Sequence, residues 1–281
     1  MTLKGRIVNK FWKSFFTPKS VVKLKNSKFY IPRLMANSFY PATYKDEPWL
    51  LETLHKINKI RYIESFIDIG VNIGQTLLKI KSINSDSKYL GFEPNPYCCY
   101  VVEQIISINK IPYCNIIPVG LGDTNSLVKL TFSEKNNLAD SSATIVEGFR
   151  DNEYEHFQYV SVVRLDDFSK NLPITKIDVI KIDIEGAELE AIKGMTMLIS
   201  RFNPIIIIEV LPSYSESNSF RINRQNELFT IVKDLGYKVY HIKNKIGELS
   251  FVELDRFPIH SNVEEADYLM LPSILDITDL N

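Results

Sequence analysis

The chain has 281 residues, of which 45% are hydrophobic and 24% are charged, and its formal net charge is −1. This length suits one large α/β domain with additions, and this composition excludes a disordered chain. A nearly neutral chain also lacks the overall positive field of a protein that coats nucleic acid, so we expect no nucleic-acid partner.

Basic charge is concentrated in an N-terminal extension, residues 1–46. Residues 1–45 contain ten Lys or Arg and no acidic residue, which leaves a net charge of −11 on the remainder. Within Met1–Phe16, apolar residues recur at spacings of three and four, which predicts an amphipathic basic helix. We favour a helix that docks on the domain or on a partner subunit. The alternative is peripheral contact with an anionic membrane.

The three cysteines, Cys98, Cys99 and Cys114, lack the spacing of a zinc site. We interpret them as reduced thiols in a reducing compartment. Lysines interrupt the N-terminal apolar residues where a signal peptide would need a continuous run, and no run approaches the roughly 18 apolar residues of a membrane span. We therefore expect a cytoplasmic protein, in peripheral contact with the inner face of the membrane if the N-terminal helix binds lipid.

From residue 47 onward the hydrophobic pattern alternates between the periods of helices and strands. Repeated strand-helix-strand units predict a parallel sheet with right-handed crossovers. The predicted elements of the first half are the helix Glu47–Lys59, the strand Ser65–Ile69, the helix Gly74–Ser82, the strand Lys88–Phe92, the helix Pro96–Asn109 and the strand Cys114–Val119. Before them, the aromatic segment Ser27–Tyr44 is strand-like.

An insertion then interrupts the alternation near residues 133–159. The polar loop Ser133–Glu155 separates the predicted strands Ser126–Phe132 and Val160–Val163 and is expected to lie above the sheet. The alternation resumes with the strand Ile177–Ile182, the helix Ala187–Ser200, the strand Ile205–Val210, the helix Arg221–Leu235 and the strands Tyr237–Ile242 and Tyr268–Leu271. We predict an α/β, Rossmann-like, seven-stranded, mostly parallel sheet with helices on both faces, over residues 47–281.

A glycine loop follows the first strand of this sheet, in the sequence FIDIGVNIGQT, which contains Asp68, Gly70, Asn72 and Gly74. Glycines allow the backbone to turn sharply and to approach a ligand. A dinucleotide enzyme would have a glycine at position 72, where it leaves room for pyrophosphate. The asparagine favours a ligand that has no phosphates and that presents a carboxylate and an ammonium group.

The next two strands also end in polar residues. The sequence YLGFEPNP places Glu93 and Pro94 at the end of the second strand, where an acid can accept both hydroxyl groups of a ribose. The third strand leads into VGLGD, and there Gly122 and Asp123 either contact an adenine amino group or simply form a turn.

Acidic residues follow the fourth and fifth strands. The sequence IKIDIEGAE supplies Asp183, Glu185 and Glu188, and the next strand ends on Glu209. Carboxyl ends of parallel strands meet at one edge, so we expect a carboxylate-rich site there. Asp183 could hold an ammonium group, while Glu185 and Glu209 could orient or deprotonate an acceptor hydroxyl, or share a divalent cation with Asp183. Glu188 is more simply explained as stabilising the start of its helix.

With these motifs in order over Ser65–Val210, the chain resembles the FkbM-type methyltransferases. The resemblance implies a class I methyltransferase fold and an S-adenosylmethionine cofactor, surrounded by Asp68, Gly70, Asn72, Gly74 and Glu93. It also implies that Asp183, Glu185 and Glu209 face the transfer site, and that the reaction is O-methylation of a sugar, glycan or natural product. Val71 stands where the family usually has a smaller residue.

Some features stay open at this stage. His156 in the inserted loop is the best histidine candidate for a general base, although a lone loop histidine is usually a surface residue. The alternatives to a methyltransferase are an NAD-dependent oxidoreductase or epimerase on a similar sheet, and a non-catalytic cofactor-fold module that binds a partner. The need for a metal and a homo-oligomeric state are not settled by the sequence.

Overall fold

The computed structural model describes residues 19–32, 45–133, 139–149, 156–172, 175–245 and 248–280. The helix predicted over Met1–Phe16 lies outside these residues. Among the helices that the structure describes, none is long and apolar enough to cross a membrane.

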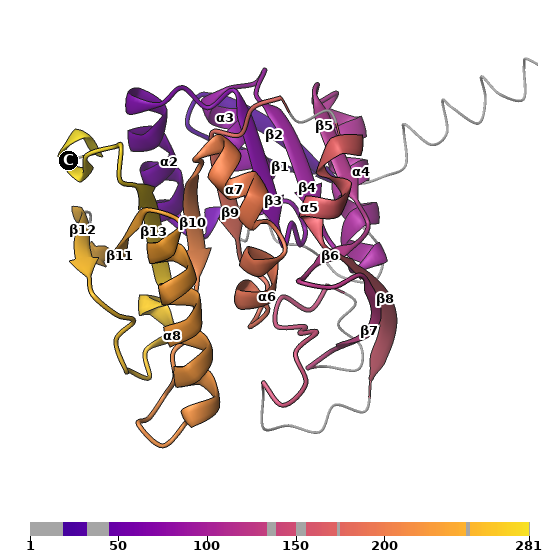
Figure 1. Ribbon diagram of the computed structural model, residues 1–281. Helices are drawn as coiled ribbons and strands as arrows, with labels where there is room; N and C mark the ends of the chain where they lie inside the picture. Colours follow the sequence, from indigo (N-terminus) through magenta and orange to yellow (C-terminus); the bar gives the residue numbers. More distant parts are fainter. Residues whose placement is uncertain are drawn as a thin grey trace, which may run out of the picture.

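A central sheet of eight strands runs through the described part of the molecule (Figure 1), in the order β12-β11-β13-β10-β9-β3-β4-β5. Six strands point the same way, while β13 and β12 run antiparallel to their neighbours. The strands are β3 Ser65–Ile69, β4 Lys88–Phe92, β5 Cys114–Ile117, β9 Val179–Ile182, β10 Ile205–Glu209, β11 Tyr237–Lys245, β12 Glu248–Leu254 and β13 Asp267–Pro272.

The prediction of a mostly parallel α/β sheet is confirmed, but the predicted count of seven strands is wrong by one. The additional strand is β12, which pairs only with β11 at the edge of the sheet. None of its residues is fully buried. It therefore lacks the apolar run by which the inner strands were found.

Helices cover both faces of the central sheet. On β3, Phe66 belongs to an apolar cluster with residues of the helices α2 and α3, while Ile67 belongs to another with residues of α6, α7 and α8. This alternation follows from the two-residue period of a strand and explains the apolar character of the inner strands. The helices are α2 Pro48–Ile60, α3 Gln75–Ile83, α4 Pro96–Asn109, α5 Leu165–Phe168, α6 Glu188–Lys193, α7 Thr196–Phe202 and α8 Ser219–Asp234.

The single helix predicted over Ala187–Ser200 is two helices, α6 and α7. A Cβ atom on Gly194 would lie 1.9 Å from the Gly122 carbonyl oxygen, and the Gly194 carbonyl accepts a hydrogen bond from the Asp166 amide. The Asp166 carboxylate in turn accepts from the amides of Met197 and Leu198, at the start of α7. A capping residue that is distant in the sequence thus begins a new helix.

Two smaller sheets accompany the central one. The first is the hairpin of β1 Lys19–Leu24 and β2 Ser27–Pro32, whose Val22 and Ile31 are fully buried in an apolar cluster with residues of α3 and α4. Of the strand-like segment Ser27–Tyr44, only β2 is described, and β1 was not predicted. The second sheet contains β6 Gly120–Leu121, β8 Phe157–Val163 and β7 Ser126–Thr131, and stands at the lower right in Figure 1.

Candidate functional site

A pocket of about 300 Å³ lies at the carboxyl ends of β3, β4, β9 and β10. The strand order changes direction between β3 and β9, and in open α/β sheets such a switch point is where ligands bind. Seven of the residues singled out from the sequence line the pocket together: Gly70, Asn72, Glu93, Pro94, Asp183, Glu185 and Glu209.

The glycine loop after β3 forms one wall. Gly70 has φ 88°, Asn72 φ 49° and Gly74 φ 90°, and asparagine tolerates this left-handed region better than most residues do. A Cβ atom on Gly70 would lie only 1.9 Å from the Asp183 carbonyl oxygen. Gly70 is therefore required by the close approach of the loop to the end of β9. Gly74 precedes α3 and does not line the pocket.

Val71, the departure from the family pattern, fits because of a glycine on the neighbouring strand. Val71 is 1% exposed, and a Cβ atom on Gly91 of β4 would come within 2.5 Å of its side chain. The missing side chain at position 91 thus provides the space that the valine occupies.

The backbone amides of this loop are largely used inside the protein. The amides of Gly70 and Val71 donate to the Phe92 carbonyl, the Asn72 amide donates to Glu93, and the Gly74 amide donates to the Val71 carbonyl. A pyrophosphate needs such N–H groups free and converging on it. The loop is therefore poorly suited to a dinucleotide.

Glu93 is anchored at the end of β4. One carboxylate oxygen accepts from the Asn72 amide and the other from the Asn95 amide, each at 2.8 Å. Burial raises the pKa of Glu93 to about 7, although both hydrogen bonds favour the ionised form. The side chain lines the pocket with unused acceptor capacity, since each carboxylate oxygen has two lone pairs.

Asp68 lies in β3, fully buried, and does not line the pocket. The Tyr89 hydroxyl donates to its Oδ2, and its Oδ1 has no hydrogen-bond partner among the described residues. Burial raises the pKa of Asp68 to about 7. The structure therefore does not support direct ligand contact by Asp68, which belongs to the interior next to the loop.

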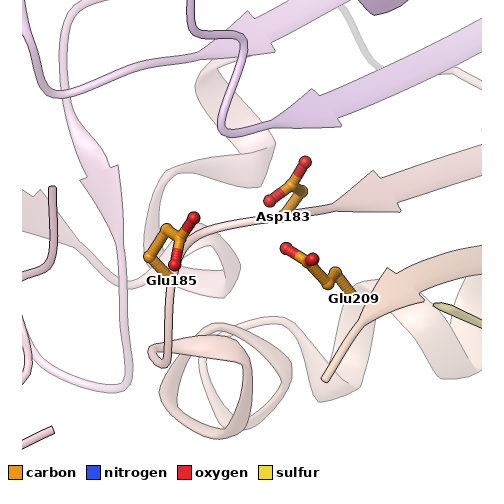
Figure 2. A group of neighbouring side chains, drawn as sticks. All are labelled: Asp183, Glu185 and Glu209. Atoms are coloured by element: carbon orange, nitrogen blue, oxygen red, sulfur yellow. The ribbon is translucent and has the colours of Figure 1, made fainter. Parts of the chain in front are cut away.

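Three acidic side chains meet at the other wall. Figure 2 shows the carboxylates of Asp183, Glu185 and Glu209 turned toward one another from the ends of β9 and β10. Their ligand atoms lie within 4.8 Å of one another. Lys181, on β9, forms an ion pair with Asp183 at 2.6 Å. Hard cations such as Mg²⁺ and Ca²⁺ prefer such oxygen ligands, so the group could also hold a divalent cation.

Charge is shared unevenly within this group. Burial would raise the pKa of Asp183, but Lys181 and a hydrogen bond from Glu209 hold it below its usual value. Burial and the neighbouring Asp183 carboxylate raise the pKa of Glu209 instead. Two adjacent carboxylates commonly share one proton, with the pKa of one lowered and that of the other raised. Near neutral pH, Asp183 is thus ionised and Glu209 carries the proton.

Glu188 performs the structural role expected of it. Its carboxylate accepts from the Gly186 amide at 2.9 Å at the start of α6 and is 5% exposed. Burial raises its pKa to about 7. It does not line the main pocket.

Besides Asp68 and Gly74, three more predicted site residues do not line the pocket. A Cβ atom on Gly122 would lie 2.7 Å from the Val162 side chain, which explains the glycine without a ligand. Asp123 is exposed in the turn after β6, as the simpler of its two interpretations expects. His156 is exposed beside Phe132, with the ring centroids 5.4 Å apart. Neither Asp123 nor His156 lines the pocket.

The pocket also contains residues that the sequence did not reveal. Asp140 of the insertion is 7% exposed and accepts hydrogen bonds from Ser133 and Ser142. Glu47 accepts from the buried Lys79 at 2.9 Å. Asp140 stands in a polar loop without a distinguishing pattern. Lys181 was detectable as the one charged residue of the strand sequence VIKI.

Comparisons with known proteins match the chain to methyltransferases. The family model described as the methyltransferase FkbM domain matches residues 68–239. Methyltransferase sdnD of Sordaria araneosa is 26% identical over 203 residues, covering 64% of this chain and 76% of that protein. Hexuronic acid methyltransferase AglP of Haloferax volcanii is 23% identical over 168 residues, covering 60% of this chain and 64% of that protein.

Among solved structures, methyltransferase FkbM from Methylobacillus flagellatus KT is 17% identical with a TM-score of 0.45, and the match covers 74% of this chain and 43% of that one. A SAM-dependent O-methyltransferase from Thermotoga maritima is 11% identical with a TM-score of 0.42, covering 94% and 80%. The family match spans more than half of the chain and contains both walls of the pocket. The chain therefore belongs to the FkbM methyltransferase domain family.

Proposed function

We propose that the chain is an S-adenosylmethionine-dependent methyltransferase whose cofactor occupies the pocket between the glycine loop and the acidic group. Two observations carry this proposal. Glu93 and Asp183 line the same pocket, and the glycine-loop amides of that pocket already donate hydrogen bonds within the protein. A nucleoside that bears an amino acid and no phosphate needs these carboxylates and does not need those amides.

The donor set fits the two ends of such a ligand. Glu93 can accept from ribose hydroxyls, and the ionised Asp183 can accept from the ammonium group. Gln75 and Thr76 line the pocket in the first turn of α3, where the helix dipole favours a carboxylate. When bound, the cofactor would supply a sulfonium methyl group to the acceptor oxygen, with the thioether S-adenosylhomocysteine as the leaving group.

We propose a hydroxyl of a sugar, glycan or natural product as the acceptor. The name of one relative supports a sugar acceptor, since that protein is a hexuronic acid methyltransferase. Residues of the insertion, among them Ser141 and Ile145, line the same pocket and would form the acceptor side. An NAD-dependent reaction is disfavoured because the glycine loop has few free N–H groups for pyrophosphate.

Within the acidic group we propose Glu185 as the residue that accepts the acceptor's proton. Asp183 is committed to Lys181, and Glu209 already carries a proton near neutral pH. Glu185 is half-buried, lines the pocket and lies shortly after β9, where its carboxylate meets those of Asp183 and Glu209. Removal of the proton as the bond to carbon forms is ordinary general-base catalysis.

A divalent cation is the other way to offset three carboxylates. We propose the proton-sharing arrangement instead, because Lys181 already neutralises Asp183. Activity that is lost in EDTA and regained with Mg²⁺ or Mn²⁺ would assign the group to a cation.

The experiment is a transfer assay with radiolabelled S-adenosylmethionine and a panel of uronic acid glycosides, neutral sugars and hydroxylated natural products. We expect label in at least one acceptor, with a loss of about 100-fold or more for Glu185→Gln. Asp123→Asn is the matched control, because that carboxylate is exposed and outside the pocket. Label transfer that is equal in Glu185→Gln and wild type would remove Glu185 from this role.

A further inference from the structure

Glu185 has an unusual backbone conformation for a residue with a side chain. Its φ is 54°, and the following Gly186 has φ 111°. Residues with a Cβ atom disfavour this left-handed region and stay in it only where their surroundings fix them. The contacts around Glu185 and Gly186 therefore determine where the Glu185 carboxylate points.

The insertion supplies the first of these contacts. The Thr144 hydroxyl donates to the Glu185 carbonyl at 2.7 Å, and Thr144 is 3% exposed. Thr144 is itself held by two backbone hydrogen bonds with Thr131 at the end of β7. This links the three-stranded sheet directly to the acidic loop.

A second contact from the insertion covers Gly186. A Cβ atom at Gly186 would lie 2.6 Å from the ring of Phe149, so the ring lies directly against that glycine. The Arg221 guanidinium is 3.9 Å from the Phe149 ring centroid and donates to the Phe149 carbonyl at 2.6 Å. It also donates to the Pro212 carbonyl at 3.0 Å. Arg221 of α8 thus secures this end of the insertion.

Helix α8 contributes a third contact, through Arg224. Its Nη2 donates to the Gly186 carbonyl at 2.7 Å, and the guanidinium forms two hydrogen bonds to the Glu190 carboxylate, at 2.7 and 2.6 Å. A planar guanidinium held at both nitrogens has little freedom to move. The Gly186 carbonyl is therefore fixed from α8, while the Glu185 carbonyl is fixed from the insertion.

We infer that Thr144 and Arg224 are positioning residues that hold Glu185 in its left-handed conformation and so direct its carboxylate toward Asp183 and Glu209. This inference rests on the proposed role of Glu185 in the reaction. Phe149 and Arg221 support it by keeping the insertion against Gly186. The inserted segment 139–149 thus orders the residue that accepts the proton, besides lining the pocket.

The test compares Thr144→Val, which keeps the shape of the side chain but loses its donor, with Thr144→Ser, which keeps the donor. Thr230→Val is the matched control, since the Thr230 hydroxyl also donates to a backbone carbonyl, that of Asn226, in an exposed part of α8. Arg224→Gln provides a second perturbation that leaves the insertion unchanged.

Hydrogen exchange of the amides of residues 184–188, with S-adenosylhomocysteine bound, is the first readout and needs no acceptor. We expect about 10-fold faster exchange in Thr144→Val and in Arg224→Gln, and wild-type exchange in Thr144→Ser and Thr230→Val. Affinity for S-adenosylhomocysteine should stay within about twofold of wild type, because Glu93 and Asp183 are untouched.

The transfer rate is the second readout, measured with an acceptor from the panel. We expect kcat to fall about 10- to 100-fold in Thr144→Val with little change in KM, and Thr144→Ser to recover most of it. Wild-type exchange at residues 184–188 in both Thr144→Val and Arg224→Gln would overturn the inference, as would equal impairment in Thr144→Ser and Thr144→Val. A wild-type protein that binds no S-adenosylhomocysteine would instead overturn the proposed function.

Discussion

The ionisation of Glu93 makes cofactor affinity depend on pH in a calculable way. Burial raises the pKa of this carboxyl to about 7, so at pH 6 only about one molecule in eleven carries the carboxylate, against about ten in eleven at pH 8. Ribose hydroxyls donate hydrogen bonds, which favour the ionised form. If the pKa of Glu93 in the complex falls well below 6, the affinity for the cofactor should rise about 10-fold from pH 6 to pH 8, which corresponds to about 1.4 kcal/mol.

The direction of this pH dependence follows from which ionisation state of Glu93 binds the ligand. A raised pKa means that the empty pocket holds the proton, and the ligand must displace it at low pH. Binding should therefore release about 0.9 proton at pH 6 and about 0.5 proton at pH 7. Calorimetry of S-adenosylhomocysteine in two buffers with different ionisation enthalpies measures that release directly.

Glu93→Gln is the control for this prediction. This variant keeps the size and one acceptor oxygen of the side chain but does not titrate. Its affinity for S-adenosylhomocysteine should be lower than that of the wild type and should lack the part of the pH dependence that comes from Glu93. Titrations of the ligand and of other pocket residues are common to both proteins and cancel. The same pH profile in wild type and Glu93→Gln would refute the assignment of Glu93 to the ribose.

Three further predictions follow from the geometry. Gly70→Ala should destabilise the protein by about 3 kcal/mol or more in urea unfolding, because its Cβ atom would meet the Asp183 carbonyl at 1.9 Å; an unchanged midpoint would contradict this close approach. Asp123→Asn should leave cofactor affinity within about twofold of wild type in calorimetry, since Asp123 is exposed, and a 10-fold loss would restore its predicted adenine contact. The ligand-free protein should lose stability as pH rises from 6 to 9. Burial raises the pKa of Glu188 to about 7 and of Asp267 to about 8, so the folded state favours their protonated forms. A melting temperature that rises from pH 6 to pH 9 would exclude that explanation.

The parts of the fold that could be predicted from the sequence are those with a strong local pattern. The apolar strands β3 and β4 and the helix α4 were predicted with the residue bounds that the structure has. The break between α6 and α7 was not predicted, because it depends on Asp166 and Gly122, which are distant in the sequence. The edge strand β12 was not predicted for a different reason, since half-exposed edge strands carry a weak apolar pattern.

The candidate site divides in the same way. Residues that directly follow parallel strands, such as Glu93, Asp183 and Glu209, meet at one edge as the topology requires. Asp140 reaches the pocket, and Thr144 reaches the Glu185 carbonyl, through the course of the insertion, which follows no period in the sequence. Asp123 shows why a glycine-acid pair is ambiguous in a sequence, because it is exposed after β6 and does not line the pocket.

Parallel calorimetric titrations of the wild-type protein and of Glu93→Ala, each against S-adenosylmethionine and against NAD, examine the pocket most directly. The account predicts that the wild type binds S-adenosylmethionine and not NAD, and that Glu93→Ala, still folded by circular dichroism, loses about 10-fold or more of that affinity. Binding of NAD in place of S-adenosylmethionine, or equal S-adenosylmethionine affinity in the two proteins, would contradict it.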